Sequence, residues 1–194
     1  MAERDRAELI LTAAGRLFMT QGISATTIRQ IAKELGTVSG TLYYYYPSKE
    51  SIASTILHRF LDDLNVEYAA FSDDPDRAAP DLLRELVRTS MRVASRHPFA
   101  TEIYQNEGAG LTILPDHVEV RAKRDVVQGH WRRIIDRGVQ TGELRADVDP
   151  DHFRWLLREL TWLTVRWHRP TLAEDHEPLA DELVSMFLDG FATR

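Results

Sequence analysis

Apolar side chains recur every three or four residues along nearly the whole chain, which is the spacing of one face of an α-helix. The segment from residue 49 to about 71 shows this most clearly, with a stripe of Ile52, Ile56, Leu57, Phe60, Leu61 and Leu64. Glycines and prolines separate the periodic segments, as expected at helix ends and loops. No segment shows the apolar–polar alternation of a half-buried strand. The pattern predicts an all-α protein of about nine helices.

The composition argues against several kinds of site. The 194 residues include no cysteine, which excludes disulfides, thiolate nucleophiles and cysteine-ligated metals. The seven histidines form neither an HExxH motif nor a pair three or four residues apart, and no glycine-rich phosphate loop occurs. We therefore expect no enzymatic activity, no metal site and no cofactor.

The chain also lacks the segments that direct a protein into a membrane. No apolar run reaches about 18 residues, so no membrane span is predicted. The first ten residues, MAERDRAELI, carry charges on both sides of any apolar start and do not fit a signal peptide. We expect a cytoplasmic protein.

Charge is distributed unevenly along the chain. The first 50 residues carry six basic and five acidic side chains, whereas the remaining 144 carry 18 basic and 25 acidic ones. A near-neutral head on an acidic body fits a small DNA-binding module joined to a larger domain. Charge alone leaves this question open.

Two short predicted helices are joined at Gly36, in the arrangement of a helix-turn-helix. The second helix, residues 39–45, has only a narrow apolar stripe of Leu42 and Tyr46, so most of it faces outward. Its small first residues fit a DNA major groove, and its tyrosines suit phosphate oxygens. The alternative is a tyrosine-rich protein–protein surface, because tyrosine is also favoured at interfaces.

Residues 9–50 resemble the DNA-binding domain of the TetR family of bacterial repressors. The matching stretches read AGRLF at 14–18 with Gly22, TTIRQIA at 26–32, and SGTLYYYYPSKE at 39–50, after Gly36. Tyr46 departs from the family pattern, which usually has Phe there. The resemblance implies an all-α homodimer whose two helix-turn-helix units enter successive major grooves of a palindromic operator in double-stranded DNA.

The same resemblance implies roles for individual residues. The residues that resemble base-edge readers are Ser39, Gly40 and Thr41. Those that resemble phosphate contacts are Thr27, Tyr44, Tyr45 and Lys49. Tyr43 is expected to pack partly beneath the recognition helix. Residues 1–48 would form the helix-turn-helix domain, and residues 49–194 the ligand-binding and dimerisation domain.

Residues 150–170 are the most informative part of the body. At about 100° per residue, one face is apolar and predicted to be core: Phe153, Leu156, Leu157, Leu160, Leu163, Thr164 and Trp167. The opposite face holds Trp155, Arg158, Trp162, Arg166 and Arg169. Tryptophan and arginine favour interfaces, but arginine also binds carboxylates and phosphates. This face therefore meets a symmetric partner, an anionic ligand with an apolar body, or both.

The last two predicted helices, at about 150–169 and 177–191, are expected to form the dimer seam. The residues expected to pack there are Leu179, Leu183, Met186, Phe187 and Phe191.

Two stretches, residues 103–107 and 162–170, also resemble the TetR branch that represses steroid (cholesterol-ring) catabolism in actinobacteria and responds to CoA thioesters. This resemblance implies that Arg158 and Arg166 bind CoA phosphates or a carboxylate, and that Trp162 offers a flat apolar surface. Gln105 and Glu107 would line the pocket. The predicted protein is a repressor released by an acyl-CoA or steroid-derived CoA thioester.

Two alternatives stay open at this stage. The first is a TetR-type regulator of efflux or fatty-acid genes that senses an uncharged hydrophobic ligand. The second is a helical enzyme or scaffold with a vestigial DNA-binding head.

Overall fold

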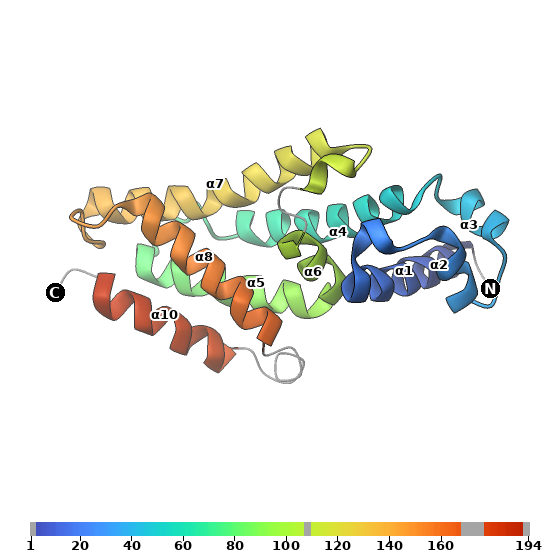
Figure 1. Ribbon diagram of the computed structural model, residues 1–194. Coiled ribbons are helices and arrows are strands. Elements are labelled where there is room, and N and C mark those ends of the chain that lie inside the picture. Colours follow the sequence, from blue (N-terminus) through green and yellow to red (C-terminus); the bar gives the residue numbers. More distant parts are fainter. Residues whose placement is uncertain (1–2, 107–109, 168–176, 192–194) are drawn as a thin grey trace. The chain divides into compact units, whose positions relative to one another are not determined.

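The computed structural model describes residues 3–106, 110–167 and 177–191, and for residues 3, 105–106, 110, 166–167 and 190–191 it describes the backbone alone. These residues form nine α-helices, one short 3-10 helix and no β-strand (Figure 1). The α-helices are α1 (Glu3–Ala25), α2 (Ile28–Glu34), α3 (Ser39–Tyr45), α4 (Lys49–Ala69), α5 (Ala79–Arg96), α6 (Pro98–Asn106), α7 (His117–Thr141), α8 (Pro150–Trp167) and α10 (Glu177–Phe191). The all-α prediction is confirmed. None of the described helices combines the length and apolar character needed to cross a bilayer.

The ends of the helices lie close to the positions that the sequence predicts. Gly22 (φ 80°) breaks α1 three residues before its end, and Gly36 (φ 61°) follows α2. Both adopt the left-handed backbone conformation that glycine tolerates best. Ser48 precedes α4, and its hydroxyl accepts a hydrogen bond from the Ser51 amide at 3.1 Å. Local chemistry therefore sets these boundaries.

The chain divides into two compact units. The first joins residues 1–60 with 97–121, and the second joins residues 61–96 with 122–194. Helix α6 therefore belongs to the same unit as the helix-turn-helix. The boundary between residues 48 and 49 divides the chain by role rather than by packing, and it stays a prediction.

Within the first unit, α1 packs against both α2 and α6. The contact with α6 is unusually close at Gly15. A Cβ atom at this position would lie 2.5 Å from ring carbons of Phe99 and 2.8 Å from the Phe99 Cβ. The last distance matters most, because a Cβ is fixed to its own helix and cannot turn away. Glycine at position 15 thus sets how closely α1 and α6 approach.

We predict that Gly15→Ala destabilises the protein. Overpacking of this kind costs about 1–3 kcal/mol, and the better helix propensity of alanine offsets about 1 kcal/mol of it. Gly40→Ala, in α3, is the matched control, because nothing lies within 4 Å of the Cβ position there. Urea unfolding should show a lower midpoint for the first variant and an equal or higher one for the second. Equal stability of Gly15→Ala and wild type would contradict the close contact.

In the second unit, α5 packs against α8 and α10. The far half of α4 contributes Tyr68, which is fully buried and whose hydroxyl lies 2.5 Å from that of Ser90 on α5. This hydrogen bond avoids the cost of burying an unpaired hydroxyl. The edge of the Tyr68 ring also meets Trp131 of α7 at 6.4 Å between ring centroids. Aromatic contacts thus join α4 and α7 within this unit.

The buried face of α8 differs from the predicted one. Leu156 is 45% exposed and Leu163 is also exposed, although both were expected in the core. Trp162, expected on the opposite face, is only 4% exposed. The buried stripe keeps the predicted Phe153 and Leu157 and adds Thr161 and Val165. Both faces of α8 carry large apolar side chains, because Trp155 and Trp162 lie among the arginines of the second face, so the sequence of the helix alone does not select the buried stripe. Helix α8 packs against α5 and α10.

The predicted dimer seam needs a similar correction on α10. Leu183 is buried within its own chain, and the ring of Phe187 meets that of Phe153 at 6.0 Å between centroids. Met186 is 71% exposed and Leu179 is half-buried. The side chain of Phe191 lies outside the described residues. Two of the five predicted seam residues therefore pack inside their own chain.

Candidate nucleic-acid interface and effector site

Every residue of helix α3 except one is exposed or half-buried. Leu42 alone among its seven residues is buried. Tyr44 is 74% exposed, and Val38, which precedes the helix, is exposed as well. The expectation that Tyr43 packs beneath the helix is wrong, because Tyr43 is exposed. It follows Leu42 directly and so lies about 100° around the helix from the buried position.

Gly40 faces open space. No heavy atom lies within 4 Å of the position that a Cβ would occupy, and the backbone does not have a positive φ. Glycine inside a helix costs about 0.5–1 kcal/mol relative to alanine. Neither packing nor backbone conformation in the described chain requires a glycine here. The small residue therefore leaves room for something outside the protein.

The hydroxyl groups near α3 differ in how they are used. Thr37 donates a hydrogen bond to the Thr41 hydroxyl oxygen at 3.2 Å, which leaves the Thr41 hydrogen able to donate elsewhere. Thr27 is the N-cap of α2, and its hydroxyl accepts from the Gln30 amide and donates to Gln30 Oε1. Thr41 is therefore better prepared than Thr27 to donate to DNA. Ser39 is half-buried at the start of α3.

Tyr45 and Tyr46 are both half-buried, but they lie in different surroundings. The Tyr45 ring meets that of Tyr44 edge-on, with centroids 5.1 Å apart. Burial raises the pKa of the Tyr46 phenol, which also feels the charges of Arg59 and Glu8. Arg59 and Glu8 form a 2.7 Å ion pair between α4 and α1. Tyr46, which stands where the family usually has Phe, thus places a hydroxyl near this ion pair.

Lys49 lies at the start of α4 and does not extend into solvent. Its ammonium donates to the carbonyl oxygens of Ile23 at 2.8 Å, Ser24 at 2.9 Å and Thr26 at 2.8 Å. An ammonium has three N–H donors, so the corner between α1 and α2 uses all of them.

The predicted effector residues are divided between the two units. Arg158 and Trp162 lie on the covered side of α8, and Arg158 donates to Glu159 Oε1 at 2.6 Å. Arg166 lies on α8 and Gln105 on α6, with side chains outside the described residues, and Glu107 lies wholly outside them. The effector roles of these residues stay a prediction.

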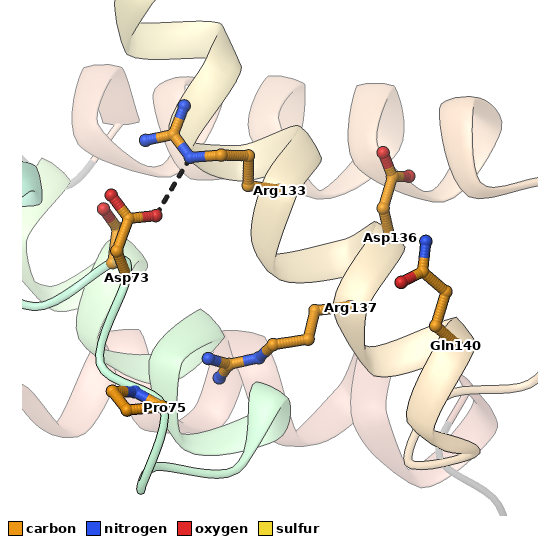
Figure 2. Close-up of a pocket in the computed structure, with 7 residues that line it drawn as sticks. Asp73, Pro75, Arg133, Asp136, Arg137 and Gln140 are labelled. Atoms are coloured by element: carbon orange, nitrogen blue, oxygen red, sulfur yellow. Dashed lines mark hydrogen bonds and ion pairs between the residues drawn. The ribbon is translucent and has the colours of Figure 1, made fainter.

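The second unit contains a surface hollow of about 510 Å³ (Figure 2). It lies between α7 and the loop that follows α4, and its lining is Ser72, Asp73, Pro75, Arg133, Asp136, Arg137 and Gln140. Arg133 Nε donates to Asp73 at 3.0 Å, while Arg137 donates to the carbonyl oxygens of Asp74 and Arg77. These arginines hold the loop in place. None of the predicted effector residues lines this hollow.

One group in the described part of the chain brings possible metal ligands together: His58, Asp116 and Glu119, whose ligand atoms lie within 4.8 Å of one another. His58 Nε2 is 2.7 Å from Asp116 Oδ2. The other ring nitrogen, Nδ1, is buried without a hydrogen-bond partner among the described residues. A histidine that binds a metal normally donates from its second nitrogen to an acceptor. The geometry thus fits a hydrogen-bonded pair better than a metal centre, and the expected absence of a metal stays a prediction.

Asp116 also accepts a hydrogen bond from the Ser54 hydroxyl, so it joins the N-terminus of α7 to α4 within the first unit. Burial raises the pKa of this carboxyl, but the hydrogen bonds from Ser54 and His58 outweigh burial and hold the pKa below its usual range. Hydrogen bonding therefore favours the charged form.

We predict that Asp116→Asn destabilises the protein at about pH 7 by on the order of 1 kcal/mol, allowing for solvent screening of the part-exposed carboxyl. Because the folded pKa is depressed, the stabilisation is present above the usual carboxyl range and is lost as the pH falls below about 4. Urea unfolding at several pH values measures the difference from wild type, with Asp136→Asn, an exposed carboxyl, as control. A difference that stays constant down to about pH 3 would contradict the depressed pKa.

Helices α2 and α3, joined by the turn at Gly36, form a helix-turn-helix whose second helix faces outward, with open space beside Gly40. This is the arrangement of a DNA-binding protein of the helix-turn-helix class. Residues 10–56 match the family model described as bacterial regulatory proteins, tetR family, and residues 76–191 match the tetracyclin repressor-like C-terminal domain. The chain belongs to the TetR family of transcriptional regulators. It is a ligand-responsive DNA-binding repressor and not an enzyme.

Individual relatives agree with this assignment. The HTH-type transcriptional repressor KstR2 of Rhodococcus jostii is 35% identical over 95% of this chain and 90% of that protein. The solved structure of the ketosteroid transcriptional regulator KstR2 of Mycobacterium tuberculosis has a TM-score of 0.87 at 28% identity, covering 97% of this chain and 96% of that one. AibR, solved with isovaleryl coenzyme A and operator DNA, has a TM-score of 0.76 at 21% identity, covering 93% and 97%, and shows the likeness of fold alone. The predicted family and its steroid-regulating branch are confirmed as resemblances over nearly the whole chain.

Proposed function

We propose that this repressor acts in the cytoplasm, binds a palindromic operator as a homodimer and is released by a CoA thioester, most simply one derived from a steroid. The observation that carries the DNA-binding part is the empty space beside Gly40 on α3, a helix that buries only Leu42. A major groove admits an α-helix, and a helix with a small residue at its surface approaches the base edges more closely.

Six of the predicted DNA contacts keep their proposed roles. Ser39, Gly40 and Thr41 lie in the first turn of α3 and would face base edges. Thr41 would donate its free hydrogen to a base acceptor in the groove. Thr27, Tyr44 and Tyr45 would contact phosphates, and Thr27 would have to turn its hydroxyl away from Gln30 to do so.

We predict that Gly40→Ala weakens operator binding by 10-fold or more while leaving the fold at least as stable as wild type. The added methyl group meets nothing in the protein, so it can act only on the bound DNA. Such a loss corresponds to about 1.4 kcal/mol or more. Fluorescence anisotropy with labelled promoter DNA measures the affinity, and urea unfolding measures the stability.

Tyr45→Phe is the matched variant for a phosphate contact and should weaken binding to operator and random DNA alike, by about 1 kcal/mol. Thr41→Ala should instead reduce the preference for operator over random sequence. If Gly40→Ala and Thr41→Ala both bind operator as wild type does, α3 is not the recognition helix.

The homodimer is supported by the apolar surface of α8 and α10. Trp155, Leu156 and Leu163 are exposed on α8, and Met186 is exposed on α10, within the same compact unit. Large apolar side chains grouped on an exposed face are typical of a protein–protein interface. The proposed seam therefore includes Leu156 and Leu163, which the sequence assigned to the core, and Trp155, which it assigned to the opposite face.

The CoA thioester is supported by the chemistry of α8 and by the relatives. The Arg158 guanidinium is mostly covered and lies one helical turn from the buried Trp162. An anion with an apolar body would compete with Glu159 for the guanidinium and pack against the ring, whereas a neutral ligand would gain nothing from the covered charge. The relatives named KstR2 include one described as a ketosteroid regulator, which favours a steroid-derived acyl group.

We predict that Arg158→Ala raises the thioester concentration needed for operator release about 10-fold, which equals about 1.4 kcal/mol, and leaves operator affinity nearly unchanged. Arg154→Ala is the matched control, because Arg154 lies one turn earlier on α8, is similarly covered and pairs with Asp151 at 2.8 Å. The assay titrates a panel of acyl-CoA and steroid-derived thioesters, each beside its free acid, against the operator complex.

Two results would overturn the effector proposal. Release by neutral hydrophobic compounds and not by thioesters would favour a regulator that senses an uncharged ligand. Loss of operator affinity in Arg158→Ala without ligand, together with an unchanged response, would place Arg158 in the dimer interface instead.

A further inference from the structure

The ammonium of Lys49 occupies a site that is built from the protein backbone. Three carbonyl oxygens, those of Ile23, Ser24 and Thr26, surround its nitrogen at 2.8–2.9 Å. The side chain is only 21% exposed. Each of the three N–H donors therefore has an acceptor inside the protein.

The three carbonyls belong to the corner between α1 and α2. Helix α1 ends at Ala25, so the carbonyls of Ile23 and Ser24 lack the amide donors that a continuing helix would supply four residues further on, although the Ile23 carbonyl also accepts from the Thr26 amide at 3.2 Å. A cation is favourable at the C-terminal end of a helix, where the carbonyl dipoles point outward. Thr26, fully buried, donates its hydroxyl to the Gly22 carbonyl at 2.7 Å and holds the corner in shape.

Lys49 and its three carbonyl partners lie on opposite sides of the helix-turn-helix in the sequence. The corner leads directly into Thr27, the N-cap of α2, whereas Lys49 follows α3 and begins α4. One side chain thus joins the segment before the helix-turn-helix to the segment after it. Between these two fixed points lie only α2, the turn at Gly36, α3 and the short link through Pro47.

We propose that Lys49 is a positioning residue that closes the helix-turn-helix by holding the α1–α2 corner against the start of α4, and that it does not contact DNA phosphate. This inference rests on the proposed DNA contacts of α2 and α3. It replaces the phosphate contact predicted for Lys49 from the sequence. A phosphate would have to compete with three carbonyl oxygens for donors that are already engaged.

Two substitutions separate the roles. Lys49→Met removes the ammonium and keeps the length of the chain. Lys49→Arg keeps the charge, but its planar guanidinium spreads its donors over three nitrogens and cannot direct three hydrogen bonds from one atom. Lys33→Met, at an exposed lysine in the last turn of α2, is the matched control for loss of one positive charge.

The experiment measures urea unfolding of each full-length variant and its operator affinity between about 50 and about 200 mM salt. A positioning role predicts that both Lys49 variants unfold at lower urea and bind operator at least 10-fold more weakly. It also predicts that the slope of log affinity against log salt matches that of Lys33→Met or wild type. A phosphate contact predicts full activity for Lys49→Arg and, for Lys49→Met alone, a slope smaller by about 0.9 for each protomer. That second result would overturn the proposal.

Wild-type protein gives a test that needs no folded variant. Nitrogen-15 NMR of lysine should show the Lys49 ammonium protons exchanging slowly with water in the free protein, and nearly unchanged after operator is added. Fast exchange in the free protein, or a large shift on adding DNA, would contradict the positioning role. If wild type bound no DNA, the proposed DNA contacts would fail, while the exchange and unfolding measurements would still decide whether Lys49 holds the corner.

Discussion

A seven-residue helix that buries one side chain cannot fix its own orientation. Helix α3 depends for its position on the segments at its two ends. Before it lie the capping box of Thr27 with Gln30 and the left-handed turn at Gly36. After it lie the Ser48 cap of α4 and the three hydrogen bonds of Lys49. The outward surface of α3 is thereby available for recognition, because Leu42 is the one buried residue among its seven.

The same unit contains a second constraint, at the contact of α1 with α6. The absence of a Cβ at Gly15 lets Phe99 approach the backbone of α1. Helix α6 comes from the middle of the sequence but packs with the DNA-binding head. Under the proposed function, a ligand releases the operator only if it binds more tightly to a state that DNA disfavours. Close packing of α1 on α6 makes any shift of α6 a shift in the surroundings of α1.

The sequence predicted the features that depend on local chemistry. Gly22, Gly36 and Ser48 mark helix ends because backbone conformation and capping act within a few residues. The outward face of α3 was likewise predicted, from the narrow apolar stripe of Leu42 and Tyr46. The prediction for Tyr43 was wrong, although helix geometry places this residue about 100° around α3 from the buried Leu42.

The features that were missed depend on distant parts of the chain. The partners of Lys49 lie 23 to 26 residues earlier and are backbone carbonyls, which carry no side-chain signature. Helix α8 packs against α5 and α10, whereas its own sequence carries large apolar side chains on both faces. For this reason Leu156 and Trp162 exchanged their predicted environments.

Hydroxyl-radical footprinting of the wild-type protein on its own promoter DNA tests most directly whether paired α3 helices read an operator. Two protected regions should appear on one face of the duplex, with centres about 34 Å apart, or one helical turn. Both should disappear together when the effective CoA thioester is added. Protection of a single region, or uniform protection of the whole fragment without two localised regions, would contradict recognition by a dimer.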